Sequence, residues 1–232
     1  MRRTKDGALA FLKPNHPSFG GMSTVPAAAL EKIAADLAFD LSLPVPPVVL
    51  VDGTKVGGKC AAAALSRYTH PKMLSCADAE RLPETNSLWH RVRRMTAKAW
   101  SGMFAFDLWL GNEDRENMEN LLIGSDPNDD PPRQELVFID YGRSMVGGGW
   151  RQKRVRETLS PPNLATSLAS SADMTVILEV ADQIARVPDG SIREIVNRIP
   201  VEFLSTQDKD VITDGLLSRR DRLRSTLGKA FR

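Results

Sequence analysis

Three oxygen-bearing side chains flank two short apolar segments in the middle of the chain. Asp114 and Asn120 precede the segment 121–123, and Asp140 directly follows the segment 136–139. The connector between the segments, GSDPNDDPPRQE, is rich in turn-forming residues, which favours an antiparallel hairpin. In such a hairpin the first residue of one strand faces the last residue of the other. We therefore expect Asn120 and Asp140 to lie side by side, with Asp114 on the loop that leads to them.

This set of side chains suits magnesium and phosphate chemistry. An Asn and an Asp make a poor zinc site, whereas Mg²⁺ takes carboxylate oxygens, keeps several waters and completes its shell with phosphates. Phosphoryl transfer also needs a carboxylate that orients or deprotonates the attacking hydroxyl, and Asp114 is the candidate. The alternative is that Asp114, Asn117 and Asn120 are turn and capping residues, and that Asp140 ends its strand in a turn.

A second pair could hold the phosphates of a nucleotide. Lys13 ends the apolar segment 8–13, and Glu31 stands in the first turns of the helical segment that follows. A strand lysine aligned by a helix glutamate fixes phosphate oxygens in kinases. Spacing alone is a weak signal, because Lys13 could be an exposed strand-end lysine and Glu31 an acid favoured by the helix dipole.

The elements that must position these residues follow from periodicity and from Gly and Pro breaks. Segments 8–13 and 45–51 are predicted strands, and the apolar spacing over 27–43 predicts a helix that Pro44 stops. The fold class is therefore α+β, with a small strand-helix-strand region at 1–68 and a mostly helical region at 69–232. The remaining predicted helices cover 87–110, 174–185, 192–199 and 211–227.

Composition restricts the class of protein. The 232 residues are 42% hydrophobic and 26% charged, which is typical of a compact globular protein. The chain holds no run of about 18 apolar residues for a membrane span and no secretory signal pattern, so we expect a cytoplasmic protein without membrane contact.

Charge and cysteine content argue against two further classes. A net charge of +2 is small for a nucleic-acid binder, so the basic clusters at 91–94, 151–156 and 219–224 are interpreted as solvated helix faces. Strongly salt-dependent binding to DNA or RNA is what the nucleic-acid alternative predicts. Cys60 and Cys76 are too few for a disulfide framework and lack metal-ligand spacing.

Several of these segments together resemble one kinase family. The stretches FDLWLGNEDRENMENLLI and LVFIDYGRS resemble the catalytic and metal-binding segments of HipA-like kinases and, more distantly, of phosphatidylinositol kinases. DGALAFLKP, the following EKIAADLAFDLSLPVPPVVLVDG and the final LLSRRDRLRSTL are similar to other parts of that family in the same order. The resemblance implies a bilobal kinase fold and transfer of the ATP γ-phosphate, with Mg²⁺, to a hydroxyl, most often Ser or Thr of a protein.

The resemblance also assigns roles residue by residue. It implies that Lys13 binds the nucleotide phosphates with Glu31 as its partner, that Asp114 is the catalytic aspartate, and that Asn120 and Asp140 bind Mg²⁺. It places the adenine-contacting hinge loosely near residues 63–67, mainly through backbone groups. The hinge candidates are Ala63, Leu65 and Arg67.

The sequence departs from the family pattern in three places. Glu116 stands where a histidine is usual, with Arg115 beside it to offset the charge. Asn120 follows Asp114 by six positions instead of five, which leaves Asn117 as a competing metal ligand. The first strand and the glycine-rich phosphate loop look short or missing, so Gly20 and Gly21 either cover the phosphates or form a flexible loop.

These departures leave two functional interpretations. The first is an active protein kinase whose partners are a protein substrate and an antitoxin-like protein, since HipA-like kinases often act as toxins held by an antitoxin. The second is a pseudokinase that binds nucleotide or a partner protein without catalysis.

Overall fold

The computed structural model of the protein describes residues 2–3, 9–14, 26–52, 62–67, 70, 72–81, 97–112, 115, 117–126, 128, 134–145 and 172–230.

A four-stranded antiparallel sheet carries one side of the candidate site. It contains β1 (Arg2–Arg3), β2 (Leu9–Pro14), β4 (Ala62–Arg67) and β3 (Val48–Asp52), in that order across the sheet. The predicted strand at 8–13 is confirmed as β2, and the short first strand is the two-residue β1. Small side chains, among them Ala28 of helix α1 (Ala27–Asp40) and Ala64 of β4, pack together and let the helix approach the sheet closely.

Helix α1 ends at Asp40, three residues before the predicted end at 43. Ser42 adopts a φ of 54°, and the Leu43 N–H donates to the Ala38 carbonyl at 2.9 Å. The Ser42 N–H donates to the Phe39 carbonyl at 3.0 Å, which completes a Schellman motif. The prediction was wrong at this end because the chain leaves the helix through a left-handed serine before it reaches Pro44.

Strand β3 begins at Val48 and not at the predicted residue 45. Pro46 and Pro47 have no N–H to donate to a neighbouring strand, so regular pairing starts after them. The Val45 N–H donates instead to the Leu43 carbonyl at 2.8 Å within the loop.

A second, three-stranded antiparallel sheet confirms the predicted hairpin. Its order is β5 (Lys72–Ser75), β6 (Leu121–Ser125) and β7 (Gln134–Phe138), with helix α2 (Cys76–Arg81) after β5. The register pairs Leu121 with Phe138 and not with Ile139, so the predicted register was wrong by one residue. Ile139 instead bonds to Asn120, because the strand pairing ends at Phe138, just before the sharp turn at Asp140. A backbone hydrogen bond joins the hairpin to the segment after α1: the Phe138 N–H donates to the Pro44 carbonyl at 3.0 Å. The predicted division of the chain at residue 68 falls between β4 and β5.

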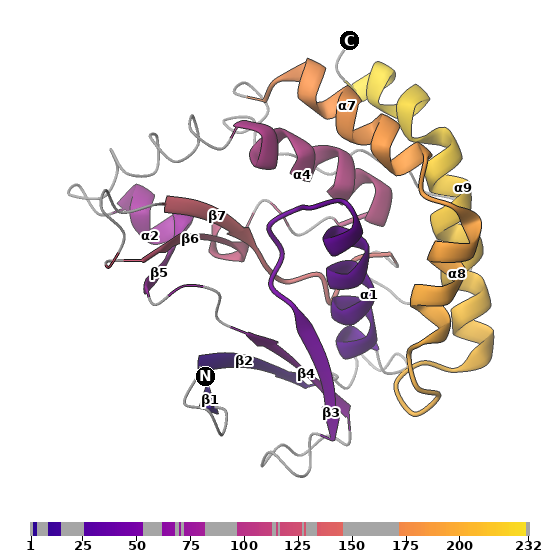
Figure 1. The fold of residues 1–232 in the computed structure, drawn as a ribbon, viewed down its shortest axis with the longest axis horizontal. Helices are drawn as coiled ribbons and strands as arrows, with labels where there is room; N and C mark the ends of the chain where they lie inside the picture. The colour runs from indigo at the N-terminus through magenta and orange to yellow at the C-terminus, as the bar shows by residue number, and fades with distance from the viewer. Residues whose placement is uncertain are drawn as a thin grey trace.

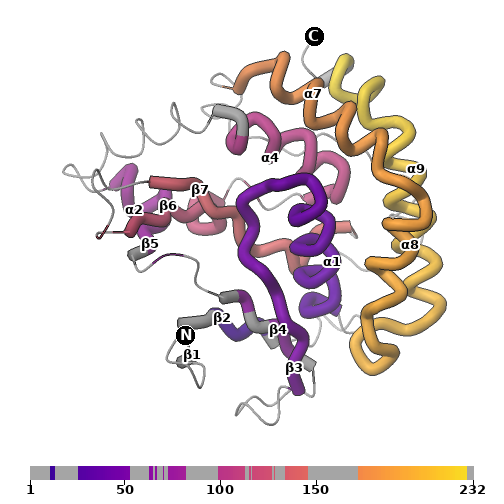
Figure 2. The backbone as a smooth tube through the Cα atoms, viewed as in Figure 1, coloured from indigo at the N-terminus to yellow at the C-terminus, as the bar shows by residue number. Residues whose placement is uncertain are grey.

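Helix α4 (Ala97–Leu110) packs against the first and the last of the three C-terminal helices (Figures 1 and 2). Residues 101–110 are all buried, as expected for a helix that is apolar on every side. The Trp109 indole N–H donates to the Leu216 carbonyl at 2.9 Å and joins α4 to the last helix. The C-terminal helices are α7 (Met174–Ala185), α8 (Asp189–Asn197) and α9 (Thr206–Ala230).

These helices confirm the predictions at the end of the chain. The segment 174–185 is α7 to the residue, and α8 and α9 start and end within five residues of the predicted runs. Residues 87–96 of the predicted helix 87–110 lie outside the described residues. Among the helices described, none is long and apolar enough to cross a membrane.

Gly111 ends α4 directly ahead of the candidate catalytic loop, and its replacement should be costly. Its φ is +64°, and a Cβ built there would lie 2.7 Å from Nη1 of the buried Arg219. We expect Gly111→Ala to lower the free energy of unfolding by about 2 kcal/mol or more, through left-handed strain and displacement of Arg219.

Chemical denaturation of Gly111→Ala beside Gly228→Ala measures this cost. Gly228 lies on exposed helix with nothing within 4 Å of its added Cβ, so its alanine variant should gain about 0.5–1 kcal/mol. Equal stabilities of the two variants would contradict the role given to Gly111.

Candidate active site

Three charged side chains from distant parts of the sequence meet between α1, β2 and the end of β7. Lys13 Nζ lies 2.7 Å from Oε1 of Glu31 and also pairs with Oδ1 of Asp140. The Glu31 side chain is only 8% exposed, whereas those of Lys13 and Asp140 are 35% and 29% exposed. A buried carboxylate therefore anchors a lysine whose amino group remains accessible beside a second carboxylate.

Glu31 is fixed from two directions. Its Oε1 accepts the Lys13 ammonium and also the backbone N–H of Gly142, at 2.9 Å. Gly142 lies close to α1, since an added Cβ would be 3.1 Å from the Cβ of Ala27. The helix glutamate thus joins the lysine strand to the segment just after Asp140, which couples the position of α1 to that of Asp140.

Asp140 has an unusual backbone conformation. Its φ is +67°, in the left-handed region that only Gly, Asn and Asp adopt at low cost. The chain turns sharply there, from strand β7 into the turn that holds Gly142. Positive φ at a non-glycine residue is frequent at functional sites, where the surrounding structure holds the backbone in place.

A cavity of about 250 Å³ opens beside these charges. Its wall is largely apolar, with the charged groups at one end, which is the composition expected of a small-molecule site. The lining residues are Phe11, Leu12, Lys13, Glu31, Val48, Ala64, Ser66, Ile139 and Asp140.

Asn120 lies opposite Ile139, one residue short of the predicted partner Asp140. The Ile139 N–H donates to the Asn120 carbonyl at 3.1 Å, and Asn120 is buried. Asn117 has a different position: it is exposed, and its Oδ1 accepts the Glu119 N–H at 3.1 Å as the cap of the 3-10 helix η1 (Met118–Asn120). Of the two predicted metal ligands in this loop, Asn120 is bonded to the residue before Asp140, and Asn117 acts as a cap.

A buried ion pair underlies this region and was not predicted from the sequence. Arg115 Nε lies 2.9 Å from Oδ2 of Asp107, and both side chains are at most 1% exposed. The Arg115 Nη1 donates to the carbonyls of Asn120 and Ile139, at 2.8 and 2.9 Å. Its guanidinium carbon lies 4.9 Å from the ring centre of Tyr141, within cation–π range.

The surroundings of Arg115 keep its guanidinium charged. Burial by itself lowers the pKa of Arg115, but the negative charge of Asp107 and its hydrogen bond raise the pKa above its ordinary value. Burial also raises the pKa of Tyr141, and the nearby Arg115 charge offsets only part of that rise. Arg115 is therefore a permanent cation and Tyr141 a neutral phenol at neutral pH.

Comparison with known proteins identifies the family. The sequence model of HipA-like kinases matches residues 3–231. The chain belongs to the HipA-like kinase family. A comparison with curated protein sequences gives no significant match.

Two solved structures, among others, share the fold of this HipA-like kinase. The crystal structure of the Helicobacter pylori proinflammatory kinase CtkA matches with a TM-score of 0.67 at 14% identity, over 98% of this chain and 90% of that one. The Shewanella oneidensis MR-1 toxin–antitoxin structure of HipA with HipB and operator DNA matches with a TM-score of 0.62 at 14% identity. That match covers 95% of this chain and 59% of the other. The predicted kinase-like α+β fold is thereby confirmed, and family membership supports a kinase-like function.

Of the remaining predicted site residues of this HipA-like kinase, the structure describes the hinge candidates but not the candidate catalytic aspartate. Asp114 lies outside the described residues, as do Glu116 and the glycines at 20 and 21. Ala63, Leu65 and Arg67 lie within β4, which pairs with β2 on one side and with β3 on the other. The β4 residues that line the cavity are the intervening Ala64 and Ser66. The adenine contacts assigned to Ala63, Leu65 and Arg67 stay predictions.

The oxygen atoms of Asp140 and Asn120 suit a Mg²⁺ ion that also binds phosphate and water, and not a metal ion enclosed by protein ligands only. Within the described ranges, no group of three or more His, Cys, Asp and Glu side chains could enclose a metal ion. The partly exposed Asp140 carboxylate, one residue after the Ile139 that bonds to Asn120, matches instead the mode of Mg²⁺, which takes one or two protein oxygens and completes its shell with phosphates and water.

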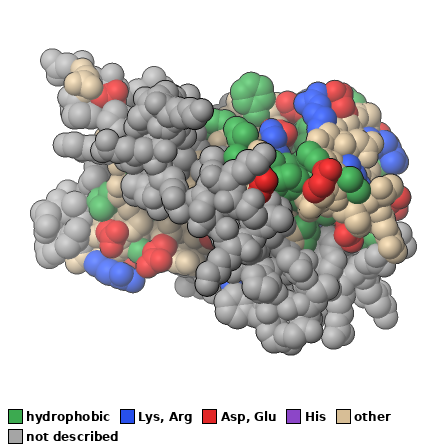
Figure 3. All heavy atoms as spheres, turned by 90° about the horizontal axis from the view of Figure 1, so that it is seen from below, with side chains coloured by type: hydrophobic (Ala, Val, Ile, Leu, Met, Phe, Trp, Pro, Cys, Tyr) green, Lys and Arg blue, Asp and Glu red, His purple; other side chains and the backbone are tan. Residues whose placement is uncertain are grey.

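The arginines of the basic cluster at 219–224 differ in their surroundings, and several of them have partners within the protein. Arg219 is buried and donates to the Leu110 carbonyl at 2.9 Å, Arg220 pairs with Asp189 at 2.7 Å, and Arg224 pairs with Asp182. The interpretation as a solvated helix face was wrong for Arg219, which faces the core. On the face that Figure 3 shows, the Lys and Arg side chains of the described residues lie among Asp and Glu side chains. The clusters at 91–94 and 151–156 lie outside the described residues.

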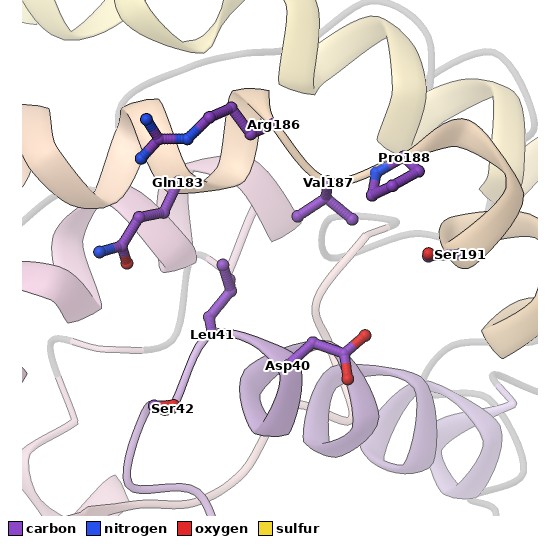
Figure 4. A pocket seen from close by; sticks show the side chains of 8 residues that line it. All are labelled: Asp40, Leu41, Ser42, Gln183, Arg186, Val187, Pro188 and Ser191. Atoms are coloured by element: carbon purple, nitrogen blue, oxygen red, sulfur yellow. The ribbon is translucent and has the colours of Figure 1, made fainter.

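A second cavity lies away from Lys13 and Asp140. It measures about 450 Å³ and separates the end of α1 from the turn between α7 and α8 (Figure 4). Its walls carry Asp40 from α1 and Arg186 from the α7 end, together with Ser42 and Ser191. Glu31 and Asp40 are nine residues apart on α1, roughly 13 Å along the axis, so this cavity is separate from the lysine–aspartate site.

Proposed function

We propose that this HipA-like kinase binds ATP with Mg²⁺ in the 250 Å³ cavity and transfers the γ-phosphate to a hydroxyl, most often Ser or Thr of a protein. The observation that carries the proposal is the meeting of Lys13, Glu31 and Asp140 at one end of an otherwise apolar cavity. An apolar wall suits a base, and a charged end suits a metal triphosphate.

Each residue has a role that follows from its surroundings. Glu31, held by the Gly142 N–H, keeps Lys13 extended toward the cavity, where its ammonium binds phosphate oxygens. Asp140 and Asn120 provide oxygen ligands for Mg²⁺, which when bound neutralises charge on the phosphates. Asp114, which lies between Gly111 and Asn120 in the sequence, orients or deprotonates the attacking hydroxyl.

The present ion pair between Lys13 and Asp140 has a consequence for binding. Asp140, which now pairs with Lys13, would face the positive charge of Mg²⁺ when it holds the metal, and Lys13 would then be available to pair with phosphate. Mg²⁺ and nucleotide should therefore bind cooperatively, each favouring the arrangement of Lys13 that the other needs.

Replacement of Lys13 tests the nucleotide half of this proposal. We expect Lys13→Met to weaken Mg²⁺–ATP binding by about 10- to 100-fold, the value of one or two hydrogen bonds to a charged group. Calorimetric titration measures it, with Lys32→Met as the matched control, because Lys32 pairs with Asp36 at 2.6 Å away from the cavity. Equal affinities for the two variants would contradict the role of Lys13.

Transfer itself is tested with γ-labelled ATP, Mg²⁺ and a bacterial lysate. Label on the protein itself or on a lysate protein, lost in Asp114→Asn, supports the kinase. Label that persists in Asp114→Asn rejects that residue as the catalytic aspartate. Tight ATP binding without any transfer would favour a pseudokinase.

A protein partner belongs to the same proposal. The HipA of Shewanella oneidensis was solved with HipB in a toxin–antitoxin system, and this chain is expected to bind an antitoxin-like protein as well. A stable complex on gel filtration with the product of a neighbouring gene would support this, and a chain that elutes alone beside that product would argue against it.

A further inference from the structure

Arg115 joins three segments whose relative positions must be fixed for the proposed phosphoryl transfer. Its guanidinium contacts Asp107 on α4, the carbonyl of Asn120 at the start of β6 and the carbonyl of Ile139 at the end of β7. Both carbonyls belong to the backbone that carries the proposed metal ligands Asn120 and Asp140.

The geometry of these bonds explains why the residue is an arginine. The Nε and Nη2 groups donate to the two oxygens of Asp107, at 2.9 and 3.2 Å, and leave Nη1 to bridge the two carbonyls. A planar fork with five N–H donors can make all four bonds at once. A lysine could keep the charge opposite Asp107 but could not hold this planar arrangement.

The neighbours of Arg115 restrict its movement. Asp107 is itself held, since the Asn112 side-chain amide donates to its Oδ1 at 3.0 Å. The Tyr141 ring lies against the guanidinium, and Phe106 of α4 packs edge-on against Tyr141 at 5.7 Å between ring centres. The cation thus occupies a fixed place under the turn that contains Asp140.

We propose that Arg115 is a positioning residue, which sets the distance between Asn120 and Asp140 by binding both backbones from the Asp107 side. Arg115 acts on the metal ligands through their carbonyls and does not itself touch substrate. Its effect on transfer rests on the proposed function, whereas its effect on the backbone does not.

Arg115→Lys tests this role with two readouts on the full chain. The first is amide hydrogen exchange without nucleotide, in peptides that cover 115–125 and 136–145 and in reference peptides from α7 and α8. We expect exchange in the first two to rise by about tenfold or more, with the reference peptides unchanged. Arg220→Lys is the matched control, because Arg220 pairs with Asp189 and the Val187 carbonyl far from the site.

The second readout separates positioning from general stability. We expect kcat of Arg115→Lys to fall by about 100-fold, the cost of a misplacement near 1 Å, while KM for ATP changes by less than about threefold. The concentration of Mg²⁺ that gives half-maximal transfer should rise, because the two ligands no longer share a fixed distance. The Arg220→Lys control should match the wild type in all three quantities.

The outcomes are distinct. Unchanged exchange in 115–125 and 136–145, or an equal rise in α7 and α8, overturns the positioning role. A rise confined to the two segments in Arg115→Lys, together with a wild-type protein that transfers no phosphate, supports the positioning role and rejects the proposed function. If Arg115→Lys does not fold, Asp107→Glu keeps both charges while it shifts the guanidinium, and the same local pattern of exchange is expected and decides the question.

Discussion

Asp140→Asn should lower the rate of phosphoryl transfer by about 1,000-fold, because a metal ligand contributes several kcal/mol to the transition state and each 1.4 kcal/mol is a factor of ten. The substitution removes the negative charge beside Lys13 and nothing else of similar size. Initial rates with γ-labelled ATP at saturating Mg²⁺ measure the effect.

The fold should survive this substitution. Asparagine accepts the φ of +67° at this position as readily as aspartate does. The lost ion pair is partly exposed, with both side chains near 30% exposed, and such pairs contribute under about 1 kcal/mol. Thermal denaturation should therefore give nearly the wild-type midpoint.

A matched control lies at the other end of the same hairpin. Asp126 accepts the N–H of Asn128 at 2.9 Å in a turn away from the cavity, and an asparagine there can still accept it. We expect Asp126→Asn to transfer phosphate at the wild-type rate. An Asp140→Asn rate within tenfold of this control would contradict the role of Asp140 as a metal ligand.

Asp107→Asn should give the largest loss of stability among these variants, about 3–5 kcal/mol. The substitution leaves the Arg115 guanidinium charged in a place where at most 1% of the side chain reaches solvent. Its pKa stays far too high for the arginine to lose its proton. For a chain of this length the melting temperature should fall by roughly 10 °C.

An exposed ion pair of the same type provides the comparison. Asp189 pairs with Arg220 at 2.7 Å, but its side chain is 61% exposed. Asp189→Asn should therefore cost less than about 1 kcal/mol. If both aspartate substitutions cost the same, the buried pair is not the structural centre of the site that we infer.

The sequence predicts the elements that have strong local signals. The apolar segments on either side of a turn-rich connector predicted the β6–β7 hairpin, but with a register one residue away from the observed pairing of Leu121 with Phe138. Strand β4 was missed because its Ala62–Ala63–Ala64 start has low strand propensity. It forms because β2 and β3 pair with it on both sides, which is information from distant parts of the chain.

The candidate site also contains residues that the sequence predicts and contacts that it does not. Lys13, Glu31 and Asp140 were predicted from residue types and from the family resemblance, and the structure brings them together. The Gly142 N–H on Glu31 could not be predicted, since backbone donors carry no signal in residue type. Arg115 had a signal: Asp107 is the only acidic residue in the apolar segment of α4, and a buried acid requires a partner.

Single-turnover transfer of the γ-phosphate tests the central claim most directly. Excess protein is mixed with γ-labelled ATP in Mg²⁺ or in EDTA, and the fate of the label is followed. The account predicts label on a Ser or Thr hydroxyl in Mg²⁺ and none in EDTA. Stoichiometric binding of ATP in Mg²⁺, with every γ-phosphate recovered intact on the nucleotide and no label on any protein, would contradict it.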